Sequence, residues 1–151
     1  MRDQFHADLK TAMKAKDQRR ASTLRLIMAA VKDRDIAARA EDKADGVDDA
    51  EILAILQKMV KQRDEAASTY EDAGRVELAE QEREELAIIK EYLPKPLSDE
   101  EADAAVAKVV AELGAASLKD MGRTMAALKE QYAGQLDMKS LSGKVKAALG
   151  G

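Results

Sequence analysis

The sequence predicts an all-α fold, in which an N-terminal helical region with a long helical hairpin is followed by a C-terminal three-helix bundle. Charged residues make up 36% of the 151 residues, and together with abundant Ala they favour helices. One Phe, three Tyr and no Trp leave little of the aromatic material that β-sheets use. Apolar residues recur at the i, i+3, i+4, i+7 spacing of amphipathic helices in one segment after another.

The first two helices are predicted over residues 1–16 and 19–39, with Asp17 as the N-cap of the second. Each helix carries one apolar stripe, formed by Phe5, Leu9, Ala12 and Met13 in the first and by Leu24, Ile27, Met28 and Val31 in the second. Four cations of the second helix lie off its stripe: Arg19, Arg20, Arg25 and Lys32. Residues 40–47 are small and charged and include a Gly, so we expect a mobile loop there.

A long helical hairpin is predicted next. Asp48 is a suitable cap for the third helix, with Glu51 at the capping-box position three residues later. The apolar stripe of this helix runs on toward Tyr70 and begins with Ile52, Ile55, Leu56 and Met59. Gly74 stands where a helix ends in the left-handed conformation, and a further helix is predicted over residues 76–93. The short connection between them predicts an antiparallel pair.

A domain boundary is predicted at Pro94-Lys95-Pro96, because proline cannot continue a helix and disfavours helix in the residue before it. The expected domains are residues 1–95 and residues 96–151. In the second domain Ser98 and Glu101 form a capping-box pattern that restarts the chain as a helix. Two more helices follow, with caps at Ser117 and Asp137 and ends near the glycines Gly114 and Gly134. Three short amphipathic helices of this kind predict a small bundle.

The chemistry of the side chains excludes several kinds of site. The sequence has no Cys and a single His, His6, so neither a thiolate metal site nor a Glu-x-x-His metal pair can form. No G-x-G-x-x-G phosphate loop occurs. No apolar run approaches the roughly 20 residues of a membrane span, and residues 1–10 do not resemble a signal peptide. We therefore expect a cytoplasmic protein without cofactor, metal or membrane partner, with no catalytic residues and no catalysis by the chain alone.

The charges of the chain are unevenly distributed. Lys and Arg against Asp and Glu number 9 and 5 in residues 1–36, which leaves a surplus of +4, and 9 and 16 in residues 37–96, which leaves −7. Residues 97–116 carry −4 (1 against 5) and residues 117–151 carry +3 (6 against 3). A nucleic-acid partner would therefore contact the basic ends of the chain, and not its acidic middle.

Six cations in the C-terminal segment are the candidate RNA-binding residues: Lys119, Arg123, Lys129, Lys139, Lys144 and Lys146. Charged runs are usually solvated faces, so these side chains could simply keep a small bundle in solution. Alternatively they contact phosphates, in a manner that weakens as salt rises. With so few aromatic residues, such contact would recognise folded RNA and its backbone.

Several short motifs follow one another along the chain: Gln62-Arg63, Tyr70, Ala73-Gly74-Arg75, Leu78-Ala79, Glu84-Glu85, Tyr92-Leu93-Pro94, Met121-Gly122-Arg123, Met125, Lys129, Ala133-Gly134 and Asp137. Through the identity and order of these motifs, the sequence resembles the GatB/YqeY family over essentially its whole length. The family usually has a second Gly where this chain has Ala126, which puts a close backbone approach at that point in doubt.

The resemblance implies two helical bodies and a likeness to the tail module of the B subunit of glutamine-dependent tRNA amidotransferase, which helps to grip tRNA. The associated activity is that of a carbon–nitrogen ligase with glutamine as amido-N-donor. We find no residues for ATP activation or for an ammonia source, so only tRNA contact is carried over, to the six cations. The expectation is a non-catalytic tRNA-binding or tRNA-metabolism accessory protein, which would contact tRNA or a tRNA-charging or amidating enzyme and no DNA.

Two alternatives stay open. The first is a helical protein–protein adaptor with no RNA role, which would dock through the acidic helix over residues 76–93. The second is an accessory subunit of an amidotransferase.

Overall fold

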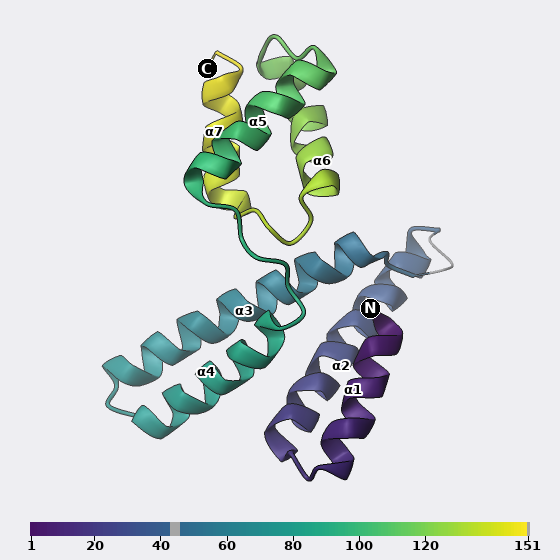
Figure 1. Ribbon diagram of the computed structural model, residues 1–151, viewed down its shortest axis with the longest axis vertical. Helices are drawn as coiled ribbons and strands as arrows, with labels where there is room; N and C mark the ends of the chain where they lie inside the picture. Colours follow the sequence, from purple (N-terminus) through teal and green to yellow (C-terminus); the bar gives the residue numbers. More distant parts are fainter. Residues whose placement is uncertain (43–45, 151) are drawn as a thin grey trace. The chain divides into compact units, whose positions relative to one another are not determined.

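The computed structural model describes residues 1–42 and 46–150. Within these residues it contains seven α-helices, one short 3-10 helix and no strand (Figure 1). The prediction of an all-α fold is therefore confirmed. The chain divides into two compact units, Met1–Leu93 and Pro94–Gly151. That each of them folds as an independent domain stays a prediction.

The first unit consists of two helical hairpins. Figure 1 shows α1 alongside α2 and α3 alongside α4, and α2 also contacts both helices of the second hairpin. Asp17 and Asp48 cap α2 and α3, because their carboxylates accept the N–H groups of Arg20 at 3.1 Å and Glu51 at 2.9 Å. The four helices have these bounds: α1 Arg2–Lys14, α2 Gln18–Ala40, α3 Asp49–Asp72 and α4 Val76–Lys90.

The core of the first unit is formed by the predicted apolar stripes of α2 and α3, together with the Phe5 ring of α1. The fully buried side chains include Leu24, Ile27, Ile52, Leu56 and Phe5, and the Phe5 ring lies edge-on to Tyr92 with centroids 5.0 Å apart. Met13 is 55% exposed, so its place in the α1 stripe was predicted wrongly. At 100° per residue Met13 lies about 80° around the helix from Phe5, which turns its side chain away from α2.

The predicted mobile loop over residues 40–47 begins later than expected, because α2 continues through Ala40. Residues 43–45 lie outside the described residues. Val47, at the end of this segment, is buried, and both its N–H and its carbonyl make hydrogen bonds to side chains of α2 and α1.

The second unit is a three-helix bundle with a 3-10 turn before its middle helix. Ser98 and Glu101 form the predicted capping box, and Gly114 ends α5 in the left-handed conformation with φ +62°. The segment after Ser117 was predicted to start directly as a helix, and instead makes one 3-10 turn. The core is built from Val106, Val109, Leu128, Leu141 and Val145. The elements have these bounds: α5 Asp99–Leu113, η1 Leu118–Asp120, α6 Met121–Gln131 and α7 Met138–Ala148.

Candidate functional site

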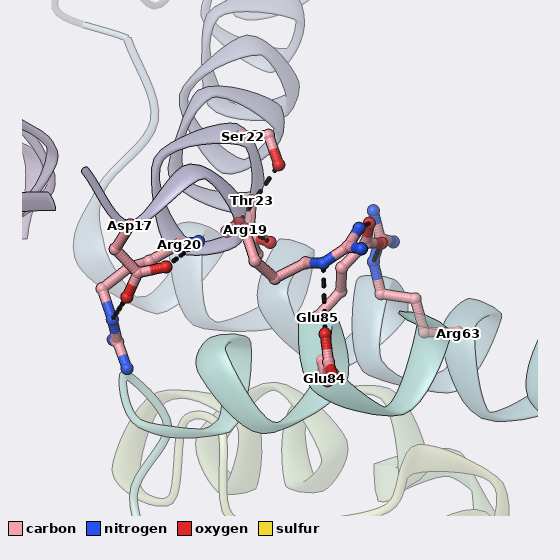
Figure 2. A network of polar contacts seen from close by, with 8 residues as sticks. All are labelled: Asp17, Arg19, Arg20, Ser22, Thr23, Arg63, Glu84 and Glu85. Atoms are coloured by element: carbon pink, nitrogen blue, oxygen red, sulfur yellow. Dashed lines mark hydrogen bonds and ion pairs between the residues drawn. The ribbon is translucent and has the colours of Figure 1, made fainter. Parts of the chain in front are cut away.

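A network of charged side chains joins three helices of the first unit, and we call it the Glu85 network: Arg19, Arg63, Glu84 and Glu85. Figure 2 shows the Glu85 carboxylate of α4 between an arginine of α2 and an arginine of α3. Its Oε2 lies 3.2 Å from Nε of Arg63, and its Oε1 lies 3.5 Å from Nη1 of Arg19. The Arg63 and Glu85 side chains are only 14% and 17% exposed, so their charges are largely withdrawn from water.

The outer part of the Glu85 network is open to solvent. Arg19 also pairs with Glu84, whose side chain is 62% exposed, at 3.2 Å, and Arg63 donates to the carbonyl of Met59 at 3.4 Å. Glu85 thus has two arginine partners, Arg19 and Arg63. The network joins α2, α3 and α4, and the geometry gives it a structural role.

A second polar cluster fixes α1 against the end of α4. The hydroxyl of Tyr92 donates to the carboxylate of Asp8, and Arg20 pairs with Glu91 at 2.7 Å and with Asp17 at 3.6 Å. Burial, followed by the hydrogen bond to Asp8, raises the pKa of Tyr92 far above its usual range. Tyr92 therefore stays protonated and serves as a hydrogen-bond donor.

An apolar depression within the described residues lies between α1 and α2, and we call it the α1–α2 groove. It encloses about 460 Å³. Its residues share these two helices: Arg2, Phe5, His6, Arg25, Met28, Ala29, Val31, Lys32 and Asp35. Buried Phe5 and Val31 with half-buried Met28 form the floor, while the exposed side chains of His6, Arg25 and Lys32 lie around it. No ion pair among the described residues involves Arg25 or Lys32, so both cations are free to meet a ligand.

One end of the α1–α2 groove is closed by a bidentate ion pair. Nη1 and Nη2 of Arg2 donate to the two carboxylate oxygens of Asp35 at 2.6 and 2.8 Å, and Nη2 also donates to the carbonyl of Val47 at 2.7 Å. Asp35 in turn accepts the N–H of Val47 at 2.9 Å. These hydrogen bonds lower the pKa of Asp35 to about 2. A Cβ on Gly46, which has φ +83°, would lie 2.5 Å from Oδ1 of Asp35, so a glycine is needed beside the pair.

The structure spreads the six predicted RNA-binding residues over η1, α6 and α7 of the second unit. Arg123 pairs with Asp120 at 3.0 Å. Lys144 is only 20% exposed and pairs with Asp103 at 2.8 Å and with Asp99 at 3.8 Å, and the Asp103 hydrogen bond raises the pKa of Lys144. Two of the six charges are therefore already matched by carboxylates. The other four are exposed and make no ion pair within the described part of the chain: Lys119, Lys129, Lys139 and Lys146.

A family model described as "Yqey-like protein" matches residues 2–149. The chain belongs to the YqeY-like family. The predicted family resemblance is thereby confirmed for almost the whole chain.

Relatives of this YqeY-like protein include three yeast proteins, each named "Altered inheritance of mitochondria protein 41, mitochondrial". The protein of Kluyveromyces lactis is 31% identical over 144 residues, which cover 93% of this chain and 71% of the relative. The protein of Lachancea thermotolerans is 34% identical over 108 residues, or 70% of this chain and 56% of the relative. The protein of Vanderwaltozyma polyspora is 33% identical over 120 residues, or 76% and 63%. The chain thus spans between about half and three quarters of the length of these relatives.

These findings correct the predicted function and location. The prediction of a tRNA-binding or tRNA-metabolism accessory, with its association to amidotransferases, is contradicted, because the relatives are named for the inheritance of mitochondria. The expectation of a cytoplasmic protein is contradicted as well, because the same names place these relatives in mitochondria.

The acidic helix α4 was the alternative docking surface for an adaptor. Its Glu84 and Glu85, with Glu91 just beyond its end, are paired with arginines of the same unit. These three carboxylates are therefore not available to a docking partner.

Among the residues that the structure describes, no group of three or more His, Asp or Glu side chains could hold a metal ion. No helix within those residues is long and apolar enough to span a bilayer.

Sequence reasoning missed the α1–α2 groove, although one signal for it was present. Arg25 and Lys32 were recognised as lying off the buried stripe of α2. Ala29 and Ile36 lie beside them at helical spacing and are exposed. An apolar line on the solvent side of a helix, flanked by cations, was the feature that could have identified a binding surface.

Proposed function

We propose that the first unit of this YqeY-like protein is a protein-binding module, which holds a segment of a partner protein in the α1–α2 groove. The observation that supports it is the composition of the groove. An apolar floor of Phe5, Met28 and Val31 is flanked by the unpaired cations Arg25 and Lys32. A concave apolar surface with a few charged groups around it is typical of sites that recognise another molecule.

The floor of the groove favours a protein ligand. Phe5 and Val31 are buried under the surrounding side chains, so they offer apolar contact only to a side chain that enters the depression. Met28 is half-buried, and a methionine adapts its flexible thioether to different apolar partners. Aliphatic or aromatic side chains of another protein satisfy this surface, whereas a flat polar surface does not.

The charged contacts elsewhere in the unit support the groove by holding α2 in place. The Glu85 network fixes one side of α2 to α3 and α4, and the Arg2–Asp35 pair joins α2 to the start of α1. The opposite side of α2 carries the groove. Binding to a surface that is already ordered loses less conformational entropy than binding to a mobile one.

Photocrosslinking in the cell tests this proposal. A photoreactive amino acid at Ala29, which is exposed in the groove, should give adducts with a protein, and these should survive nuclease and disappear with protease. The matched control is the same substitution at Ala87, an exposed alanine of α4, which should give none of these adducts. Equal adducts at both positions, or adducts at Ala29 with nucleic acid alone, would contradict the proposal.

A further inference from the structure

The surface of the α1–α2 groove continues along α2 as a line in which two cations alternate with two apolar residues. Arg25, Ala29, Lys32 and Ile36 follow one another at i, i+4, i+7 and i+11, so they share one side of the helix. The first three line the groove, and Ile36 is 54% exposed one turn beyond Lys32. From Arg25 to Ile36 this surface is about 16 Å long, or three helical turns.

The surface is also cationic. Arg25 and Lys32 are exposed cations within this line on α2, and α1 carries the exposed Lys10 one turn after His6, which lines the groove. The carboxylate at the groove itself, Asp35, is already neutralised by Arg2. The exposed Asp3 lies one turn before His6, so with Lys10 α1 contributes one positive and one negative side chain beside the depression.

From this juxtaposition we propose that the groove binds an acidic amphipathic α-helix of a partner protein, about three turns long, with its apolar stripe over Met28 and Ala29 and its carboxylates toward Arg25 and Lys32. This inference rests on the proposed function and names the partner's chemistry. A helix is favoured because side chains on one side of a helix recur at the same spacing as the line on α2, so carboxylates can face its two cations and apolar side chains its Ala29 and Ile36. The acidic character follows from charge complementarity with cations that no described carboxylate pairs with.

Three other occupants fit the surface less well. The Phe5 ring is buried and presents no face on which a nucleic-acid base could stack. A lipid surface cannot enter the depression to reach Phe5 and Val31, although it could meet Ile36. In a second copy of this chain, Glu84 and Glu85 of α4 are already paired with arginines, so only the glutamates nearer the start of that helix could meet the groove.

The test measures binding of synthetic peptides to the full chain by fluorescence anisotropy. The probe is an amidated peptide of roughly 20 residues, long enough to form a helix on binding, with Leu at every third or fourth position and Glu on both flanks. One control peptide has Lys in place of every Glu, and another has Ser in place of every Leu. We expect binding of the first peptide alone, with a rise in its helical circular dichroism, and weaker binding at higher salt because the ion pairs are screened.

Two pairs of variants locate the site. Arg25→Glu with Lys32→Glu should weaken binding by roughly tenfold or more, because two attractive contacts become repulsive. The matched control reverses two exposed, unpaired lysines of α3, Lys58→Glu with Lys61→Glu, and should change the dissociation constant less than about twofold.

An apolar pair of variants completes the design. Ile36→Ser should weaken binding, whereas Leu26→Ser, at an apolar position 45% exposed and about 80° around α2 from Ile36, should not. Both side chains are about half exposed, so neither change should unfold the protein.

Two results would overturn the inference. The first is equal binding of the acidic and basic peptides, or acidic-peptide binding that both charge-reversed variants retain. The second is binding of anionic phospholipid vesicles, blocked by the Arg25 and Lys32 reversals, with no binding of the peptide. In either case, protein adducts at Ala29 would still support the proposed function. If no such adducts form, both the proposed function and this inference are contradicted.

Discussion

Replacing Glu85 by Gln should destabilise the first unit more than any other single change at a charged side chain of the Glu85 network. The substitution keeps the size of the side chain and removes its charge. Arg63 and Arg19 then face one another across an uncharged amide, and Arg63 loses its carboxylate partner at 3.2 Å in a site where its side chain is only 14% exposed.

The expected loss in the free energy of unfolding lies between the values for breaking a buried ion pair and a surface ion pair. Removing one partner of a fully buried pair costs about 3–5 kcal/mol, and an exposed pair contributes about 0.2–1 kcal/mol. Because the two side chains are mostly but not fully buried, and because Gln can still accept one hydrogen bond, we expect a loss of about 2 kcal/mol in the free energy of unfolding.

Chemical denaturation followed by far-UV circular dichroism measures this loss from the shift in midpoint at constant slope. The matched control is Glu84→Gln, whose side chain is 62% exposed, and it should cost less than about 0.5 kcal/mol. Adding Arg63→Met to Glu85→Gln should recover part of the loss, because it removes the buried charge that has lost its partner. Equal effects of the two single variants, or no recovery in the double variant, would refute a role based on buried charge.

Three further predictions concern the Gly46 turn, the Arg2–Asp35 pair and the second unit. Gly46→Ala should lower the free energy of unfolding by about 2–3 kcal/mol, because of its positive φ and the contact of the new Cβ with Asp35. Gly74→Ala, at a position with φ +74° and open space around it, should lower it by only about 1 kcal/mol. Equal losses for the two variants in chemical denaturation would contradict this. The pKa of Asp35 is about 2 in the fold and about 3.9 in the unfolded chain, so its contribution is present above pH 4 and lost as the pH falls toward 2. Asp35→Asn should therefore flatten the stability profile in that window by about 2 kcal/mol, and an unchanged profile would count against the pair. Ser98→Ala should destabilise the second unit by about 1 kcal/mol through loss of the capping box, which a midpoint identical to that of the parent protein would disprove.

Local patterns in the sequence were sufficient to predict the helices and most of the core. The stripes that contain Leu24 and Leu56 are buried as expected, and the Ser98–Glu101 capping box forms. Such features depend on residues a few positions apart, which helical geometry alone brings together. The burial of Met13 was predicted wrongly, because the apolar stripe predicted for α1 covers a wider part of the helix surface than its contact with α2.

Contacts between distant helices could not be predicted in this way. Glu85 and Arg63 are 22 residues apart, and their pairing depends on the register of the α3–α4 hairpin. Lys144 was treated as a free cation, yet its pairing with Asp103 is made across 41 residues between α7 and α5. A count of cations in a segment does not reveal which of them are already matched, and this is one reason why the RNA-binding prediction was not reliable.

The groove was missed for a related reason. Periodicity identifies the side of α2 that is buried within its own unit, where Ile27 is fully enclosed. It does not show that α1 and α2 leave a depression over Met28 on another side. That feature depends on how two helices pack together.

The most direct test of the groove as a binding surface is NMR chemical-shift mapping of the full chain during titration with the acidic amphipathic peptide. We predict that the largest shift changes fall on α1 and α2 around His6, Met28 and Lys32, with little change in α4 or in residues 94–150. Shifts concentrated on α4 or on the second unit, or no saturable shifts at all, would contradict the account.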